Sequence, residues 1–451
     1  MNKLSFFLKR ELSVSVQNPL NIKRLVCRSK GAVEGDLIVL REGRDKAGTT
    51  SRAVLNNKVG ESIPILSSKQ QDRLSNPILL TGDTQKIVEK YISYKRREFS
   101  TKWIFVTGSV GKTTTSYMLH NALQLFSSSY YARQGNVYSA ICSSACLLDE
   151  EKAEYAVFET AQGALPEASA KFHPDVSVFI SLSPAHMERH TDLKSLAICK
   201  AAIFEGGEKG DKAIINRDIE FYDVVKNIAN KNNRDVISYG EHREADFRII
   251  DLDTYKFKFK YLDKEYTVKQ RVVGKHISFN LLSVISTLHA LGFSWENQLD
   301  SISNTIYVPR GRGNIVNRSL SSNKGSVAFI DHSYNATPLS MHSALQMLKD
   351  YPAKHRKIAV LSDMLELGVD SDKYHSGVVN TLMDLELDLV ITCGKELNKK
   401  LVNSYRGKYI SFSCVEDIFS YLDTALMDGD VVMVKGSNGT GLRKGFKKYL
   451  Y

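Results

Sequence analysis

The sequence contains no apolar stretch near the roughly 18 to 20 residues that a membrane-spanning helix needs. Its apolar N-terminal segment, "LSFFL", is followed at once by Lys9, Arg10 and Glu11, so it is too short and too interrupted for a signal peptide. These absences exclude the usual membrane and secretory classes, and they predict a cytoplasmic protein.

Cysteine is scarce, with six residues in a chain of 451. The only close pair, Cys142 and Cys146, has the spacing C-x-x-x-C and no companion cluster of Cys or His. A disulfide framework is therefore not expected, and reduced thiols are. The sequence also lacks low-complexity segments and short-period repeats, which argues against a solenoid or a disordered array.

Acidic residues are fewer than basic ones, 50 against 61, which gives a formal net charge of +11. This excess favours polyanionic partners, but it does not separate nucleic acid from nucleotides and phosphorylated small molecules. The densest basic segment is the terminal "RKGFKKYLY", which a solvated face also explains. Proteins that bind single-stranded nucleic acid use clusters of interleaved aromatic and basic side chains. The sequence has no such cluster to support nucleic acid as the partner.

The length exceeds what one hydrophobic core usually supports, so several domains are expected. Residues 1–98 are mixed, with strands at "DLIVL" and "SIPIL" and a closing helix at "TQKIVEKYISYKRREF". Residues 99–313 alternate strands and helices, with strands at "WIFVTG", "YAVFET", "VSVFISL" and "KAIIN" and an antiparallel meander between Ala245 and Gly274. Residues 314–451 repeat the alternation, with strands at "VAFID", "KIAVLSD", "LDLVITCG", "YISFS" and "DVVMVKGS", and predict a Rossmann-like domain. The predicted fold class is α/β.

The segment "WIFVTGSVGKTTTSYMLHNAL" reads as a strand, a Gly-bounded turn and a helix. Gly108 and Gly111 let backbone amides point at an anion, and the helix N-terminus adds a favourable dipole. The position five before Gly111 is Val106 and not Gly, so the loop is a shortened variant of the usual phosphate-binding loop. We predict that residues of this loop bind the phosphates of ATP: Thr107, Gly108, Ser109, Val110, Gly111, Lys112, Thr113 and Thr114.

This loop resembles the ATP loop of the Mur ligases, which use ATP to join amino acids or peptides to a carboxylate in peptidoglycan precursors. The resemblance continues in order through "SLSPAHMERH", "AICKAAIF", "GKHISFNLLSVISTLHALG" and "GRGN". The segments "FIDHSYNATPLSMHSAL", "AVLSDMLELG" and "VMVKGSNG" are closest to the branch that adds D-alanyl-D-alanine, and "CRSKGAVEGDLIVLREGRDKAGTTSRAVLNNKVG" is similar to the family's UDP-sugar-binding module. The resemblance implies a three-domain architecture with a central phosphate-loop domain.

It also implies a reaction, in which a carboxylate attacks the γ-phosphate of ATP and an amine attacks the resulting acyl phosphate. Catalysis of both steps rests mainly on positioning and on stabilising negative charge. The resemblance implies that Lys112 lies at the phosphates, that Thr113 and Glu159 hold one magnesium ion, and that His186 and a carbamylated Lys200 hold a second. It also implies ATP contacts from Asn280, Arg312 and Asp331. The substrate contacts it implies come from Asn136, Tyr334, Asn335 and Lys435.

Ordinary structural roles are open for several of these residues. Glu159 ends an apolar strand, where a carboxylate needs a partner that is a metal ion or a cation. His186 also fits a loop histidine and Lys200 a solvated helix charge. Asn280 also fits a simple helix-interior residue, and Arg312 fits a linker salt bridge.

The sequence departs from the family near the acceptor. "ETAQGAL" resembles a segment of cyanophycin synthetase and of poly-γ-glutamate synthases, and "VYSAICSSA" replaces an Asn-rich sequence. The pairs His276-Ile277 and Asp331-His332 stand where the family has His-Asn and Asp-Asp. The substrates expected are a small-molecule carboxylate, such as a UDP-linked peptide, and an amino-acid or peptide amine. The alternatives are a cyanophycin-type amino-acid ligase outside peptidoglycan synthesis and a nucleic-acid-binding NTPase.

Overall fold

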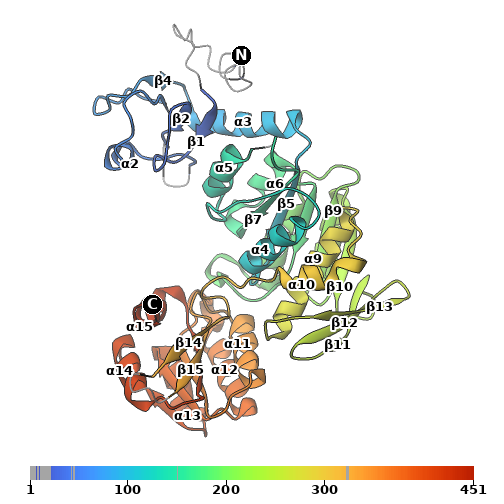
Figure 1. Ribbon diagram of the computed structural model, residues 1–451, viewed down its shortest axis with the longest axis vertical. Coiled ribbons are helices and arrows are strands. Elements are labelled where there is room, and N and C mark those ends of the chain that lie inside the picture. The colour runs from blue at the N-terminus through green and yellow to red at the C-terminus, as the bar shows by residue number, and fades with distance from the viewer. Residues whose placement is uncertain are drawn as a thin grey trace.

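The computed structural model describes Phe7, Arg10 and residues 22–41, 43, 46–149, 151–320 and 325–450. Over these residues the chain forms an elongated molecule with three sheets of four, nine and six strands, which follow one another along its long axis (Figure 1). Within that part of the chain, no helix combines the length and apolarity needed to span a membrane. Of the N-terminal "LSFFL" segment, Phe7 alone lies among the described residues.

The first sheet is small and entirely parallel, with the order β1-β2-β3-β4. Its strands are short, β2 and β3 are buried, and the Arg24 guanidinium binds the buried Asp36 carboxylate at 2.8 Å. A long helix, α3, then runs from this sheet to the central one (Figure 1). The elements are β1 (Arg24–Val26), β2 (Asp36–Val39), α2 (Ser51–Asn56), β3 (Ile65–Ser67), β4 (Ile78–Leu80) and α3 (Thr84–Glu98).

The central sheet has the order β13-β12-β11-β10-β9-β8-β5-β7-β6 and is parallel from β11 to β6. The predicted antiparallel meander is present and belongs to this sheet. Its first strand pairs with β10 in parallel, so β11, β12 and β13 extend the same sheet. The strands are β5 (Lys102–Thr107), β6 (Ser129–Tyr131), β7 (Tyr155–Glu159), β8 (Val176–Phe179), β9 (Lys212–Asn216), β10 (Asp235–Gly240), β11 (Phe247–Leu252), β12 (Lys256–Tyr261) and β13 (Lys264–Lys269).

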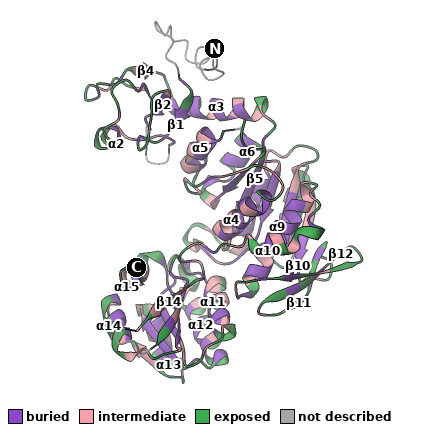
Figure 2. Ribbon diagram, in the orientation of Figure 1, coloured by how far each residue is buried: buried purple, intermediate pink, exposed green. Residues whose placement is uncertain are grey.

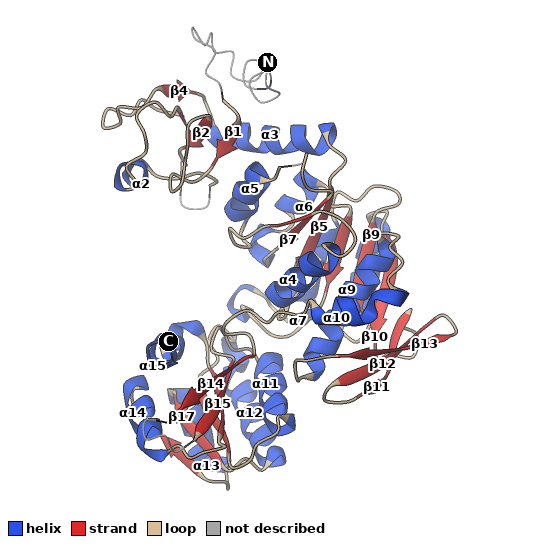
Figure 3. Ribbon diagram, in the orientation of Figure 1, coloured by secondary structure: helices blue, strands red, loops and turns tan. Residues whose placement is uncertain are grey.

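Helices cover both faces of this sheet, as the near-continuous apolar strands require (Figures 2 and 3). Helices α4, α9 and α10 pack on one face and α5, α6, α7 and α8 on the other. The second face continues through α3 into the first sheet, so one hydrophobic core joins both. The helices are α4 (Lys112–Leu123), α5 (Tyr138–Leu147), α6 (Glu167–Phe172), α7 (Leu193–Ala201), α8 (Tyr222–Lys231), α9 (Lys275–Ala290) and α10 (Leu299–Asn304).

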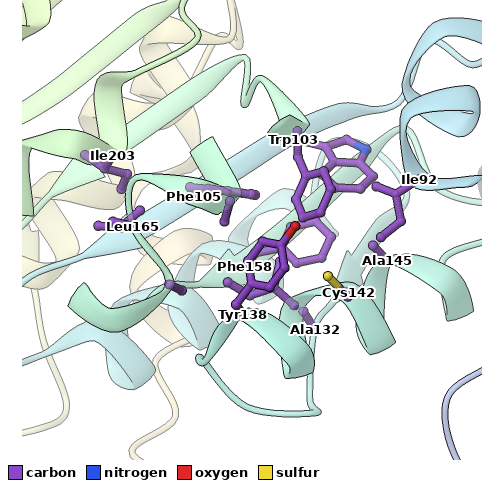
Figure 4. Close-up of a cluster of buried hydrophobic side chains, with 14 of the residues drawn as sticks. Ile92, Trp103, Phe105, Ala132, Tyr138, Cys142, Ala145, Phe158, Leu165 and Ile203 are labelled. Atoms are coloured by element: carbon purple, nitrogen blue, oxygen red, sulfur yellow. The ribbon is translucent and has the colours of Figure 1, made fainter. Parts of the chain in front are cut away.

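Aromatic rings fill the centre of this shared core (Figure 4). The rings of Trp103 and Phe158 stack with centroids 4.7 Å apart, and those of Tyr138 and Phe172 stack at 5.8 Å. Because Trp103 and Phe158 belong to neighbouring strands β5 and β7, this packing fixes the two strands that carry the phosphate loop and Glu159.

The third sheet has the order β14-β15-β19-β16-β17-β18, with only the edge strand β14 antiparallel among its described pairings. Helices α11, α12 and α13 cover one face, and α14 and α15 the other. The elements are β14 (Asn314–Ser319), β15 (Ser326–Asp331), α11 (Pro338–Asp350), β16 (Lys357–Ser362), α12 (Ser371–Leu385), β17 (Leu389–Cys393), α13 (Lys395–Ser404), β18 (Tyr409–Ser411), α14 (Val415–Ala425), β19 (Val431–Lys435) and α15 (Leu442–Leu450).

The predicted α/β class is confirmed, and each strand named from the sequence is present. All six cysteines are free, as predicted. The predicted bounds of the three domains, 1–98, 99–313 and 314–451, stay a prediction. Strands β1, β4, β6, β10 and β14 were not predicted.

Lys95 ties α3 to the central sheet's covering helices. Its side chain is buried, and its ammonium group donates hydrogen bonds to the carbonyl oxygens of Ala145 at 3.0 Å, Cys146 at 3.4 Å and Leu148 at 2.6 Å. These carbonyls end α5, where the last turn has no intrahelical donors of its own and the helix dipole favours a cation.

We expect Lys95→Met to lower the free energy of unfolding by about 1.5 to 3 kcal/mol, because it leaves buried carbonyls without their charged donor. Urea titration followed by circular dichroism measures the change. Lys86→Met is the matched control, since Lys86 lies on the same helix with an exposed side chain. Equal stability of the two variants would contradict this role for Lys95.

Candidate functional site

The phosphate-type loop lies between β5 and α4 and is anchored to the segment that follows β8. Ser109 Oγ donates to the Ser183 carbonyl at 2.7 Å, and the Val110 amide donates to Ser181 Oγ at 2.9 Å. Gly111 precedes α4 with a φ of 82°, and a Cβ on Gly108 would lie 2.6 Å from an Ile180 side-chain atom. Both glycines are therefore required by the backbone path, as the sequence predicts.

Two lysines converge on this loop. Lys112 Nζ donates to the carbonyl oxygens of Gly108 at 2.8 Å and Ser109 at 3.3 Å, and Lys200 Nζ donates to the same Gly108 oxygen at 3.2 Å. Burial lowers the pKa of Lys112, and burial together with the Lys112 charge lowers the pKa of the fully enclosed Lys200 to about 7. Lys200 is therefore not the solvated helix charge that the sequence left open.

The carboxylate of Glu159 joins residues from four segments. Its Oε2 accepts from Thr113 Oγ1 at 2.7 Å, and its Oε1 accepts from Asn136 Nδ2 at 2.6 Å. Thr113 Oγ1 in turn accepts from Arg312 Nη2 at 3.1 Å, which brings the entry of the C-terminal sheet onto the loop. The structure thus places Asn136, Glu159, Thr113 and Arg312 together, and the buried carboxylate is hydrogen-bonded as such a group must be.

This cluster supplies the hard oxygen donors that magnesium prefers, in Thr113 and Glu159. His186 is not part of it. Its Nδ1 pairs with Glu366, which comes from the C-terminal half, and the Met187 amide donates to the Glu366 carbonyl at 3.0 Å. Among the described residues no group of three or more His, Cys, Asp or Glu side chains could hold a metal ion. The predicted second magnesium site at His186 and a carbamylated Lys200 stays a prediction.

Asn280 lies on α9 against the loop. It is buried, and its Oδ1 would lie 3.0 Å from a Cβ on Gly111. Thr107 and Thr114 are buried in the same loop, and Thr107 Oγ1 donates to the Thr160 carbonyl at 3.0 Å. Their predicted contacts with ATP stay a prediction.

The C-terminal sheet contributes the ends of β15 and β19, which are parallel neighbours. Asp331 Oδ1 accepts from the amide and the hydroxyl of Ser333, at 3.0 and 2.6 Å. Lys435 Nζ donates to the Asn335 carbonyl at 2.9 Å. Burial, with the Arg312 charge, lowers the pKa of Lys435 to about 7. Carboxyl ends of parallel strands are the usual ligand edge of such sheets.

Tyr334 completes this edge. The guanidinium carbon of Arg312 lies 3.7 Å from its ring centroid, and that of Arg443 lies 4.4 Å from the same centroid. The rings of His276 and His332 lie 6.0 Å apart where α9 meets the C-terminal sheet. Burial and the Lys435 charge lower the pKa of His276 to about 4.

Sequence reasoning missed Glu366, Ser181 and Arg443. Glu366 lies within the quoted "AVLSDMLELG", and Arg443 begins the dense basic "RKGFKKYLY". The charge of both residues is visible in the sequence. Their partners, His186 and Tyr334, lie on segments far away in the sequence.

Two family models match the chain: "Mur ligase middle domain" over residues 106–288 and "Mur ligase, glutamate ligase domain" over residues 311–438. Among curated proteins, the UDP-N-acetylmuramoyl-tripeptide--D-alanyl-D-alanine ligase of Rickettsia prowazekii is 27% identical over 450 residues, covering 96% of each chain. The protein of the same name from Bacillus subtilis is 24% identical over 391 residues, covering 82% of this chain and 80% of its own.

Solved structures agree in fold. MurF from Acinetobacter baumannii superimposes with a TM-score of 0.81 at 22% identity, over 95% of this chain and 93% of its own. MurF ligase from Thermotoga maritima, solved with ADP, has a TM-score of 0.77 at 23% identity, over 96% of this chain and 98% of its own. These similarities extend over all three sheets.

We expect Gly111→Ala to weaken ATP binding by roughly tenfold, because a side chain at this left-handed φ is strained and its Cβ would press on Asn280. Isothermal titration with MgATP measures the affinity. Gly377→Ala is the matched control, since this α12 glycine has open space around its Cβ and no positive φ. Unchanged affinity in Gly111→Ala would remove the loop geometry from nucleotide binding.

Proposed function

The chain belongs to the Mur ligase family of ATP-dependent, ADP-forming amide ligases, and from this premise we propose that it joins a UDP-linked muramoyl tripeptide to D-alanyl-D-alanine. The observation that carries the proposal is the hydrogen-bonded chain Asn136–Glu159–Thr113–Arg312, which connects the phosphate loop to the C-terminal sheet. Relatives that align over nearly the whole chain are named for this reaction.

In this proposal Lys112 stabilises the charge that develops on the transferred phosphoryl group. Its ammonium lies over the loop carbonyls of Gly108 and Ser109 and can turn outward to phosphate oxygens. Gly108 to Thr114 hold the phosphates through backbone amides, and Asn280 contacts the adenosine end of ATP. Arg312 and Asp331 reach the nucleotide from the C-terminal sheet, and Asn136, Tyr334, Asn335 and Lys435 contact the substrates.

Thr113 and Glu159 would hold a magnesium ion, which supplies neutralisation of phosphate charge. Their oxygens are already adjacent, so this site fits the residues present. A second site at His186 and a carbamylated Lys200 fits less directly, because His186 is held by Glu366. We propose it only for a state in which His186 has left Glu366.

Carbamylation of Lys200 is supported by its surroundings. An amine must be neutral to take up carbon dioxide, and the enclosed position of Lys200 beside Lys112 disfavours its charged form. The modified side chain would be an anion next to Lys112, where an unmodified ammonium is repelled.

The remaining alternatives have less support. The curated relatives cited here are named ligases of UDP-N-acetylmuramoyl peptides, and no contact in the site favours nucleic acid. Because "ETAQGAL" differs from the family's sequence near the acceptor, the identity of the amine substrate is decided by experiment. A cytoplasmic location is part of the proposal, since the substrates named for the relatives include a UDP-linked peptide.

The proposal is tested by measuring ADP release across a panel of amino acids, dipeptides and UDP-linked peptides, with the mass of each product. Ligation of D-alanyl-D-alanine to the UDP-linked tripeptide is expected. ADP release that depends on another amine would correct the acceptor, and ATP hydrolysis stimulated only by nucleic acid would overturn the ligase assignment.

We expect Lys112→Ala to lower the ligation rate by roughly a hundredfold or more, since it removes a charge aimed at the transferred phosphoryl group. The rate at saturating substrates is the measurement, and thermal unfolding shows that the fold persists. Lys102→Ala serves as the control, because Lys102 begins β5, the strand that leads into the loop, and pairs at the surface with Asp175. Normal turnover in Lys112→Ala would contradict its role.

We expect Lys200→Ala to lose most activity and to recover part of it with added formate or acetate, which can occupy the space of the carbamate. Intact mass after rapid denaturation at alkaline pH, or a difference density map, detects the extra carboxyl group in the wild type. Near-normal activity of Lys200→Ala without additive would overturn the carbamate and leave the first magnesium site standing.

A further inference from the structure

The basic segment at the C terminus is only partly a solvated face. In α15, Leu442 and Phe446 pack into the core, and Lys444, Lys447 and Lys448 are exposed. Arg443 differs from these lysines, because it is half-buried and its guanidinium lies over the ring of Tyr334. The helix lies at the end of the C-terminal sheet that is nearer to the central sheet (Figure 1).

The hydrogen-bond donors of Arg443 are not all paired within the described part of the protein. Its Nε is buried and has no hydrogen-bond partner among the described residues, and no described carboxylate forms an ion pair with it. A buried donor without an acceptor costs free energy that a bound ligand recovers. A guanidinium carries a planar set of donors suited to two oxygens of a carboxylate or phosphoryl group.

The position of Arg443 relative to Arg312 also favours a bound anion. Both guanidinium groups lie on the ring of Tyr334. Two cations that lie on one ring repel each other, and an anion bound by both offsets this repulsion. Arg312 also donates to Thr113 in the phosphate loop, so the pair lies at the reacting end of the site. Tyr334 is 38% exposed, so a ligand can reach this pair.

We propose that Arg443 is a substrate-binding residue that, together with Arg312, grips an oxyanion of a substrate across the ring of Tyr334. This inference rests on the proposed ligase function. The shared chemistry is a planar or tetrahedral group with two free oxygens, which is either the terminal carboxylate of the incoming peptide or a phosphoryl group of ATP. Arg312 reaches the loop side of this group and Arg443 the α15 side.

The test compares Arg443→Ala and Arg443→Lys with Lys444→Ala, which removes the same charge from the next residue of the helix. We expect Arg443→Ala to raise the KM for one substrate by roughly ten- to a hundredfold, as loss of a charged hydrogen-bond pair does. Arg443→Lys keeps the charge but not the planar fork, so part of the loss remains. Lys444→Ala keeps wild-type constants.

Two arms distinguish the sources of the oxyanion. A rise confined to D-alanyl-D-alanine identifies the peptide carboxylate, and a rise confined to ATP identifies a phosphoryl group. Methylguanidinium added to Arg443→Ala restores activity if a guanidinium binds the substrate. Unchanged KM for both substrates, or a loss that follows thermal stability and is not rescued, overturns the inference.

Failure of the proposed function has a different signature. In that case the wild type itself forms no product of the expected mass with any amine of the panel. Arg443 is then judged by calorimetric titration of the wild type and Arg443→Ala with MgATP and with D-alanyl-D-alanine, which needs no turnover. Equal affinities of the two proteins for both ligands overturn the inference in that case also.

Discussion

The buried carboxylate of Glu159 is the group on which the site depends. A carboxylate at the end of an apolar strand is costly unless its oxygens are hydrogen-bonded, and here each oxygen has one donor, Thr113 and Asn136. Because the Thr113 hydroxyl also accepts from Arg312, the same interaction that satisfies Glu159 holds the C-terminal sheet against the loop. Because this buried charge must be hydrogen-bonded, it holds together the segments that carry Asn136, Thr113 and Arg312.

The packing beneath the site serves this arrangement. Trp103 and Phe158 stack on neighbouring strands, so β5 and β7 present Thr107 and Glu159 at the same edge. The core on this face continues through α3 into the first sheet, and Lys95 closes it by satisfying the end of α5. A change in α3 would thus be felt at α5, which follows Asn136 in the chain.

Much of this could be predicted from the sequence, because the signals are local. Strands such as "VVMVK" and "AVFE" are unbroken apolar runs, and the loop around Gly111 and Lys112 is a short motif with a physical mechanism. The missed strands lack such a signal: β6 has three residues, and the edge strand β14 reads "NIVNRS". Membership of β11 in the central sheet depends on its pairing with β10, which periodicity does not report. The contacts of Glu366 with His186 and of Arg443 with Tyr334 cross between segments far apart in the sequence, so no local pattern could reveal them.

The charges around the site also explain why substrate binding and assembly of the two sheets belong together. Burial lowers the pKa of Lys112, Lys200, Arg312 and Lys435, which means that the protein encloses these cations at a cost. Arg312 and Lys435 come from the C-terminal half, and Lys112 and Lys200 from the central sheet. A polyanionic ligand placed between them offsets the repulsion of both groups at once, so it binds the assembled arrangement more tightly than either half alone. The ligand therefore stabilises the contact between Arg312 and the loop, and the contact completes the site for the ligand.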